Sequence, residues 1–338
     1  KYGYRMPAEW ELHEGIWLAW PYREETFPRL QDVAVTYTRM IHAIHLHERV
    51  HLLVRHAPME AHVSTVLQNA GVRMDRVDLH MTDYADVWLR DSGPTFVINR
   101  REKKLALVGW KFNAWGEKYS ELVRDEAIPI RLKEMLGLPL FKPGIILEGG
   151  SIDVNGRGVV MTTEQCLLNP NRNPTMSRRE IERYLQEYLG MEQVLWLQEG
   201  IAGDDTDGHI DDIARFADPK TILCAVEEDR GDENFSNLQG NLHILQKARD
   251  QEGNPFRIIP VPMPDHIERD TRLPASYLNF YIGNQVVLVP VFGVENDARA
   301  LDIISKAFPK RDVVGIDCQA LVQGLGTLHC VSQQQPVI

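Results

Sequence analysis

The stretch "ILEGGSIDVNGRGVVMTT", residues 146–163, joins an acidic, glycine-rich turn to a β-branched run of strand length. Its carboxylate, Glu148, follows three apolar residues and precedes two glycines. A carboxylate beside a buried segment needs a partner, and the glycines let backbone or a ligand approach closely. The stretch therefore predicts a strand with a functional or ion-paired acid at its end.

Helical segments alternate with such strands along the chain. The clearest is "SRREIERYLQEYLG" (177–190), in which Ser177 and Glu180 form a capping-box pair, one face is apolar and Gly190 is a stop signal. Residues 297–308 also have a helical pattern, and 311–317 follow as a strand. Further strand-like runs are 49–55, 104–110, 157–163, 220–226 and 284–293. This alternation indicates an α/β or α+β class.

Acidic or glycine-rich turns recur next to these runs. We predict that they directly follow strands and that their polar tips meet at one end of a ring of βα units, around a central cavity. The turns are "HEGIWLAWP" (13–21), "DVWLRDSGP" (86–94), "ILEGGSID" (146–153), "DGHIDD" (207–212), "VFGVEND" (291–297) and "GLGTLHC" (324–330). Their spacing is too irregular to establish a repeat.

The length of the chain indicates its domain organisation, and its net charge argues against some kinds of partner. A chain of 338 residues exceeds the size at which one core stops growing, so two domains or a modular architecture is expected. The polar region 227–272 is a candidate insertion or lid. Lys and Arg number 37 against 48 Asp and Glu, a net charge of −11, which disfavours nucleic acid and anionic membranes as partners.

The cysteines and apolar runs indicate a reducing, cytoplasmic setting. The four cysteines form no CxxC pair, so neither a disulfide framework nor a zinc site is predicted. The first residues lack an apolar signal core, and the longest apolar runs are too short to span a bilayer.

Five aspartates surround His209 in "GDDTDGHIDD", residues 203–212. The spacing of acids and glycine does not fit an EF-hand, and a His-x-Asp pair supplies at most two of the ligands that zinc needs. One interpretation of the run is a solvated acidic loop in which Asp211 caps the next helix. The other is a site for a cationic ligand.

Asp91 and Cys330 occupy similar turns elsewhere in the chain. Asp91 lies in "DVWLRDSGP", where neighbouring Arg90 is expected to pair with a carboxylate, and Cys330 lies in "GLGTLHCVSQQQP". Taken alone, the acid fits a structural ion pair and the cysteine fits a small buried residue. A glycine-rich loop would instead expose the sulfur to a bound molecule.

A cysteine, a histidine and several carboxylates together suit attack on a guanidinium carbon. Two aspartates can hold this planar cation through paired hydrogen bonds. Its carbon is resonance-stabilised, and a thiolate is the strongest nucleophile available. Nearby carboxylates raise a thiol pKa, whereas a cationic substrate or protonated His209 lowers it. His209 could protonate departing ammonia and then activate water.

These motifs together resemble the agmatine deiminase family of the guanidine-modifying (pentein) superfamily. The matching pieces, from Met6 to Pro336, are "MPAEWELHEGIWLAWP", "WLRDSGPTF", "FNAWGEKY", "LEGGSID", "GDDTDGHIDDIARF" and "LHCVSQQQP". The resemblance implies a single catalytic domain over 1–338, a five-fold pseudosymmetric α/β propeller of ββαβ-type units around a central channel. It also implies no metal or organic cofactor, and a homo-oligomer is a family expectation.

The resemblance further implies that agmatine and water give N-carbamoylputrescine and ammonia through a covalent amidino-cysteine intermediate. Cys330 would be the nucleophile, His209 the acid/base, Glu148 its orienting group, and Asp91 and Asp211 the guanidinium ligands. Asp205 would meet the far amine of the substrate, and Trp88 and Trp115 would wall its methylene chain.

Several alternatives stay open. Leu325 and Thr327 occupy positions of the cysteine loop that are usually richer in glycine or polar residues in the family, so the substrate could be an arginine derivative or peptidyl-arginine. Amidino transfer, hydrolysis of a methylated arginine, metal-dependent hydrolysis and a non-enzymatic binding module are further hypotheses.

Overall fold

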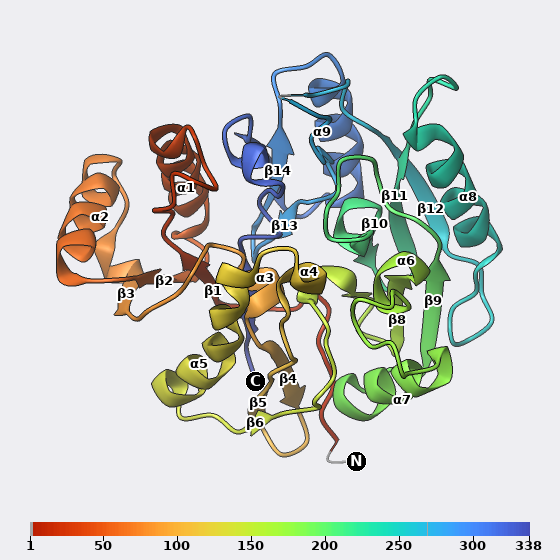
Figure 1. Ribbon diagram of the computed structural model, residues 1–338, viewed down its shortest axis with the longest axis horizontal. Coiled ribbons are helices and arrows are strands. Elements are labelled where there is room, and N and C mark those ends of the chain that lie inside the picture. The colour runs from red at the N-terminus through yellow and green to blue at the C-terminus, as the bar shows by residue number, and fades with distance from the viewer. Residues whose placement is uncertain (1–2, 269) are drawn as a thin grey trace.

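One strand topology occurs in every main sheet of the molecule. The computed structural model describes residues 3–268 and 270–338, and the strands among these residues form five sheets. Each sheet begins with an antiparallel pair and continues with a parallel pair, and one sheet carries a further parallel strand. Figure 1 shows the sheets around a common centre, with α2, α5, α7, α8 and α9 toward the outside. This is the α/β propeller expected from the sequence.

The strands lie in four three-stranded sheets and one four-stranded sheet. The three-stranded sheets contain β4 (Thr95–Asn99), β5 (Lys104–Val108) and β6 (Leu140–Phe141); β7 (Asp153–Val154), β8 (Val159–Thr163) and β9 (Gln193–Leu197); β10 (Ala214–Asp218), β11 (Thr221–Val226) and β12 (Arg257–Pro262); and β13 (Tyr281–Ile282), β14 (Val286–Val291) and β15 (Asp312–Asp317). The four-stranded sheet contains β16 (Gln333–Pro336), β1 (His13–Ala19), β2 (Arg49–Val54) and β3 (Val77–Met81).

Helices connect the parallel strands, because parallel neighbours need a long crossover. These connections contain α1 (Leu30–Ile44), α2 (Ala57–Asn69), α4 (Ala114–Glu117), α5 (Ile128–Leu136), α6 (Glu164–Leu167), α7 (Arg178–Leu189), α8 (Asn234–Lys247) and α9 (Asn296–Ala307). The remaining helical turns are α3 (Leu89–Ser92), η1 (Met74–Arg76), η2 (Ser120–Ala127), η3 (Gly149–Ser151), η4 (Ile210–Asp212) and η5 (Leu321–Gly324).

Helix α7 forms where the sequence predicts it. The Ser177 hydroxyl accepts from the Glu180 backbone N–H while the Glu180 carboxylate accepts from the Ser177 N–H, so the predicted capping box is present. The helix buries Ile181, Leu185 and Leu189. It ends at Gly190, whose φ of 71° is a left-handed conformation that glycine adopts without steric cost.

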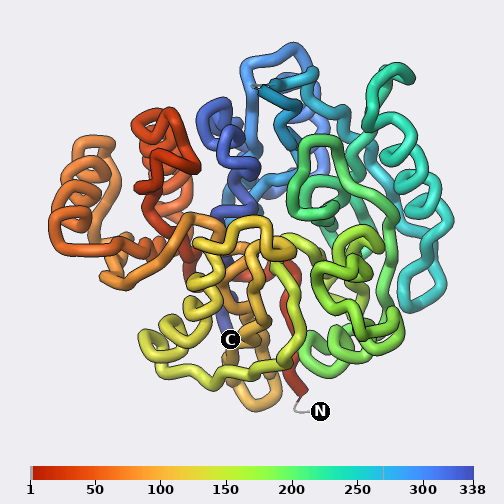
Figure 2. Tube along the Cα trace, in the orientation of Figure 1, coloured from red at the N-terminus to blue at the C-terminus, as the bar shows by residue number. Residues whose placement is uncertain are grey.

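The two ends of the chain close the ring. Strand β16 pairs antiparallel with β1, and the Trp17 indole N–H donates to Gln335 Oε1 at 2.8 Å. Figure 2 shows the N-terminal and C-terminal segments running together near the centre. Closure of the ring thus places the residues just before β16, among them Cys330, beside turns from the middle of the chain.

The four turns that carry Asp91, Glu148, His209 and Cys330 stand on the opposite side of their strands from the prediction, whereas the turn 291–297 follows β14 as predicted. Asp91 precedes β4, Glu148 precedes β7, His209 and Asp211 precede β10, and Cys330 precedes β16. The apolar residues before each acid make no regular sheet, whereas the residues after it begin the first strand of a sheet. Since each sheet repeats the same order of strands, these starting points all lie at the same end of the ring.

Two further expectations were wrong. Residues 13–21 do not form a polar turn, because 13–19 are β1, which is paired on both sides and buried from Ile16 to Ala19. Asp211 does not cap a helix, since it lies inside the short turn η4 and accepts from His329 instead. A short stretch that mixes polar and apolar residues looks the same in sequence whether it forms an exposed turn, a helix cap or a buried part of a strand or site.

The polar region 227–272 supplies α8 and β12 to the sheet of β10 and β11. Strand β12 pairs in register with β11, from Thr221 opposite Arg257 to Val226 opposite Pro262. A lid role for this region stays a prediction. Among the described residues no helix is both long and apolar enough to cross a bilayer.

Candidate active site

Gly150, in the turn before β7, marks the point at which the predicted side chains meet. Its backbone N–H donates to Asp91 Oδ1 at 2.9 Å. A methyl group on its α-carbon would lie 2.6 Å from His209 Nδ1, 2.8 Å from Asp91 Oδ1 and 3.0 Å from Asp211 Oδ2. Two turns that are far apart in sequence, that of Asp91 and that of His209 and Asp211, therefore place an imidazole and two carboxylates around one glycine.

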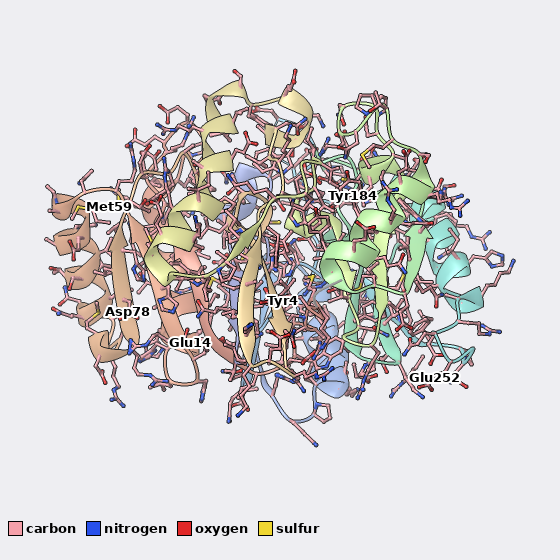
Figure 3. The ribbon with its side chains drawn as sticks, turned by 90° about the horizontal axis from the view of Figure 1, so that it is seen from below. Tyr4, Glu14, Met59, Asp78, Tyr184 and Glu252 are labelled. Atoms are coloured by element: carbon pink, nitrogen blue, oxygen red, sulfur yellow. The ribbon has the colours of Figure 1, made fainter. Side chains whose placement is uncertain are left out.

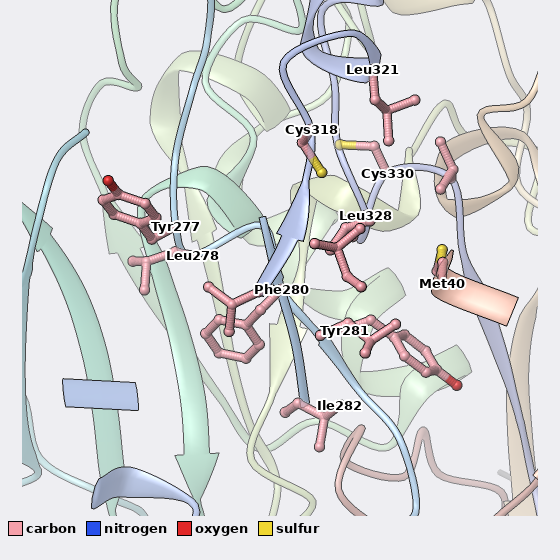
Figure 4. Close-up of a cluster of buried hydrophobic side chains, with 14 of the residues drawn as sticks. Met40, Tyr277, Leu278, Phe280, Tyr281, Ile282, Cys318, Leu321, Leu328 and Cys330 are labelled. Atoms are coloured by element: carbon pink, nitrogen blue, oxygen red, sulfur yellow. The ribbon is translucent and has the colours of Figure 1, made fainter. Parts of the chain in front are cut away.

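Cys330 lies beside this group. Its Sγ is 3.9 Å from Asp211 Oδ2 and accepts a hydrogen bond from Asn279 Nδ2 at 3.1 Å. Figure 4 shows the residue next to the apolar cluster that contains Leu328 and Phe280, and its exposed fraction is only 6%. It also lines a cavity of about 210 Å³, so the thiol is not sealed within the core.

The same cavity brings in the predicted substrate-binding residues. Trp88, Asp91, Trp115 and Asp205 all line it. The Trp115 indole N–H donates to Asp91 Oδ2 at 2.9 Å, and the Asp205 carboxylate accepts from the Tyr119 hydroxyl. The two tryptophans and Asp205 thus line the same cavity as the thiol.

Burial and like charge determine the protonation of the empty site. Burial, with Asp211, Asp212 and Asp91 adding negative charge, raises the pKa of Cys330 well above its ordinary value. Burial and Asp211 likewise raise the pKa of Asp91 well above that of an exposed aspartate. The thiol and the Asp91 carboxyl therefore favour their neutral forms until a cation enters.

The pKa values of His209 and Asp211 are lowered, in contrast to those of Cys330 and Asp91. Burial lowers the pKa of His209 to about 3 despite the attraction of Asp211, so the imidazole is a neutral base in the empty site. Burial alone would raise the pKa of Asp211, but the hydrogen bond from His329 and the nearby positive charges, that of Arg215 among them, together outweigh burial and lower it. Asp211 is thus the carboxylate that stays charged and faces the thiol.

Glu148 lies near His209 without bonding to it. Its Oε1 accepts from Arg172 Nε at 2.6 Å, whereas Glu148 Oε2 and both ring nitrogens of His209 are buried without a hydrogen-bond partner. Burial raises the pKa of Glu148, although Arg172 opposes the shift. Among the described residues that line the cavity neither Glu148 nor His209 is found, so these unpaired atoms lie behind its wall.

Asn279 was missed by the sequence reasoning. It precedes β13, the position in its sheet that Asp91, Glu148 and His209 occupy in theirs. Its Oδ1 accepts from Thr327 Oγ1 at 2.8 Å and from the His329 N–H at 3.0 Å, while its amide donates to the Cys330 sulfur. Its position before a strand is the signal that would have identified it.

His329 and Glu9 were missed as well. His329 bridges two acids, with Nδ1 at 2.7 Å from Asp211 Oδ2 and Nε2 at 2.8 Å from Glu9 Oε2. Arg90 makes the predicted carboxylate pair, at 3.8 Å from Glu9, and donates to Gln334 Oε1 at 2.7 Å. The chain contact between Glu9 and His329 exists only once the ring closes, so no local pattern indicates it.

We expect Gly150→Ala to lower kcat/KM by about a hundredfold, because the new methyl group would displace Asp91, His209 and Asp211 by a sizeable fraction of an ångström. The change should leave the fold intact, since the φ of this glycine is not positive. Steady-state kinetics with a thermal unfolding curve is the check. Gly240→Ala in α8 is the matched control, and equal activity of the two variants would contradict this geometry.

A thiol, an imidazole and paired carboxylates that converge in the centre of a five-sheet ring define a class of protein. It is the class of α/β enzymes that modify guanidine groups. Comparison with known proteins then places the chain more closely.

Residues 5–336 match the family described as Porphyromonas-type peptidyl-arginine deiminase. The agmatine deiminase of Ectopseudomonas mendocina is 36% identical over 99% of this chain and 96% of its own. The Enterococcus faecalis agmatine deiminase structure superimposes with a TM-score of 0.90, at 32% identity over 99% of this chain and 96% of that chain. A substrate-bound cysteine-to-serine variant of the C. jejuni agmatine deiminase gives 0.88, at 32% identity over 98% and 96% of the two chains.

The chain therefore belongs to this deiminase family, as its sequence motifs predicted. A Microseira wollei amidinotransferase structure, at 14% identity and a TM-score of 0.53, shares the fold alone.

Proposed function

We propose that the protein hydrolyses agmatine to N-carbamoylputrescine and ammonia, with Cys330 as the nucleophile. The observation that carries this proposal is the position of the Cys330 sulfur, 3.9 Å from a charged Asp211 and on the wall of a cavity that Asp91 also lines. A guanidinium placed there meets carboxylates on its nitrogens and the sulfur at its carbon.

Binding of the cation prepares the nucleophile. Asp91 and Asp211 hold the guanidinium, whose positive charge offsets the carboxylates that raise the thiol pKa. The Cys330 proton passes to neutral His209, and the thiolate adds to the guanidinium carbon. His209 then gives that proton to a terminal nitrogen, the C–N bond breaks, and ammonia leaves an S-alkylamidinium on Cys330.

Water completes the reaction. His209, neutral again, removes a proton from a water molecule as its oxygen attacks the same carbon. The carbon–sulfur bond then breaks and leaves a thiolate, while the hydroxyl proton of the adduct passes to the released ammonia or solvent as the carbamoyl carbonyl forms. Asn279 stabilises that thiolate through its amide N–H on the sulfur. His209 finally returns its proton to Cys330, which restores the neutral thiol and imidazole.

The lining of the cavity favours a cationic tail. Its acidic residues are Glu25, Asp86, Asp91, Glu121 and Asp205, against a single lining cation, Arg23, among the described residues. An amine at the far end of the substrate is attracted there, whereas an α-carboxylate would be repelled. Agmatine has the amine and lacks the carboxylate.

The test compares agmatine, free arginine and a peptidyl-arginine as substrates, with ammonia and ureido product measured and products identified by mass. We expect agmatine to have the highest kcat/KM. Asp205→Asn should raise KM for agmatine about tenfold or more with a smaller change in kcat, because it removes a charged partner of the tail. Glu187→Gln, on the exposed face of α7, is the matched control. Preference for a peptidyl-arginine, or an unchanged KM in Asp205→Asn, would refute the assignment of the tail.

The proposal includes a cytoplasmic setting. Cys166, Cys224, Cys318 and Cys330 are all free thiols, which supports a reducing compartment.

A further inference from the structure

The outer edge of the four-stranded sheet carries two histidines and an aspartate on neighbouring strands. His51 of β2 pairs in register with Asp78 of β3, and His80 lies two residues further along β3, hence on the same face of the sheet. His51 Nδ1 is 3.1 Å from His80 Nε2 and 3.5 Å from Asp78 Oδ2. None of these residues takes part in the proposed catalytic site.

A neighbouring acid determines which nitrogen of His51 faces this cluster. The outer nitrogen of His51, Nε2, lies 3.0 Å from Glu14 Oε2, a carboxylate of β1 that can only accept. In the neutral ring the proton therefore sits on Nε2, and Nδ1 presents its lone pair to His80 and Asp78. His80 Nε2, 3.1 Å away, donates its proton to that lone pair, and this proton must move to His80 Nδ1 through solvent when an ion binds. A carboxylate that holds the outer nitrogen of an imidazole is the arrangement found behind metal-bound histidines.

Trp17 fixes both rings in place. Its indole stacks on His51 at 4.4 Å and on His80 at 5.0 Å between ring centres. The pair is thus preorganised by packing before any ligand arrives.

We propose that His51, Asp78 and His80 form a binding site for a divalent first-row transition ion, outside the catalytic centre. Imidazole nitrogen with one carboxylate is a ligand set for such ions. With bonds of about 2.1 Å, two nitrogens 3.1 Å apart subtend about 95° at the ion, a cis arrangement of octahedral or square-based coordination. Water would complete the shell.

The surroundings permit entry of the ion. The His51 side chain is 9% exposed, but that of Asp78 is 40% exposed and opens the site to solvent. Arg49 Nη1 holds both Asp78 oxygens, at 3.0 and 3.1 Å, and must release one of them when the ion binds. Figure 3 shows Glu14 and Asp78 on the same outer side of the molecule.

A bound metal ion would link β3, the edge strand of this sheet, to β2 through shared ligands. It would also link β3 to β1, because Glu14 of β1 contacts the ligand His51. Edge strands have one unpaired side and open more readily than central strands. The ion would therefore stabilise this part of the ring, since a ligand that binds only the folded state raises its stability.

The experiment titrates tag-free, chelator-treated protein with Zn²⁺ by calorimetry and follows Tm. We expect one site that His80→Gln abolishes and Glu14→Gln weakens by about 10–100-fold. Saturating Zn²⁺ should raise the Tm of the unchanged protein by about 2 °C or more and leave that of His80→Gln unmoved. His62→Gln, an exposed histidine of α2, is the matched control and should bind like the unchanged protein.

A second cluster must be separated from this one. Ligand atoms of Glu148, Cys166 and His209 also lie within 4.8 Å of one another. Zn²⁺ there would inhibit the enzyme and would be lost in Cys166→Ala. Binding that survives His80→Gln, or the absence of any site at micromolar Zn²⁺, overturns the proposal, whereas Zn²⁺ binding that is lost in His80→Gln and kept in Cys166→Ala supports it.

Discussion

Cys330→Ser is expected to reduce kcat for agmatine on the order of 10⁴-fold or more. A serine hydroxyl at this position is a far weaker nucleophile than a thiolate, and no neighbouring residue can replace the carbon–sulfur bond of the intermediate. Binding should persist, because the Asp91 and Asp211 carboxylates are unchanged. Rapid-quench kinetics for turnover and calorimetry for binding are the measurements.

Mass spectrometry of the quenched protein provides the control. The unchanged enzyme should carry an adduct of agmatine less ammonia on Cys330, and Cys330→Ser should carry none. Cys224→Ala replaces another buried thiol, in β11, and should keep both activity and adduct. Turnover in Cys330→Ser close to that of the unchanged enzyme would eliminate the covalent route.

The same thiol has an expected pH dependence. Its pKa is raised by burial and by three aspartates, so at pH 7 the empty enzyme holds mostly thiol. Alkylation of Cys330 by iodoacetamide should accordingly be slow at neutral pH and still increase above pH 9. A rate that levels off near pH 7 in the substrate-free enzyme would show that the thiolate exists without the cation.

His209→Gln is expected to lower kcat by about 10²–10⁴-fold, the usual contribution of a general acid–base. The amide can occupy the space of the ring but cannot accept the Cys330 proton or deliver it to the leaving nitrogen. KM should change less than kcat, because Asp91 and Asp211 still hold the guanidinium. His42→Gln, an exposed histidine of α1, is the matched control for steady-state kinetics.

The pH profile distinguishes this role from a structural one. Since the pKa of His209 is lowered to about 3, the imidazole is already neutral throughout the range of an ordinary assay, and protonation removes its function only near pH 3. In the pH profile of kcat/KM, titration of His209 should therefore cause no change near pH 6.5. A limb at that pH that vanishes in His209→Gln would contradict the neutral-base assignment.

Local patterns were sufficient for several elements of the fold. The capping box and apolar face of 177–190 predicted α7, and β-branched runs predicted β2, β5, β8, β11, β14 and β15 within a few residues. These signals depend on contacts between near neighbours in sequence, so one chain is enough to detect them. The position of the acidic turns relative to the strands was harder to predict, because a polar turn has the same sequence pattern before a strand as after it.

The residue types in the sequence predicted the chemistry of the site. The set of site residues that they predicted was incomplete. Asp91, Glu148, His209 and Cys330 could be named because each stands in a turn that carries a reactive group. Asn279 was not named, since an asparagine beside aromatic residues resembles an ordinary turn until the strand that follows it is recognised. His329 was visible next to Cys330, but its partners Asp211 and Glu9 are 118 and 320 residues away.

By itself the amino-acid order determined the alternation of strands and helices, the groups able to perform guanidine chemistry and, through its motifs, the family. Tertiary structure alone decided that the reactive turns begin the first strands, that Glu148 bonds Arg172 instead of His209, and that burial leaves the thiol and imidazole neutral in the empty site. The reason is physical: side-chain types and short-range periodicity belong to the chain, whereas desolvation and contacts between distant turns arise only when the ring closes.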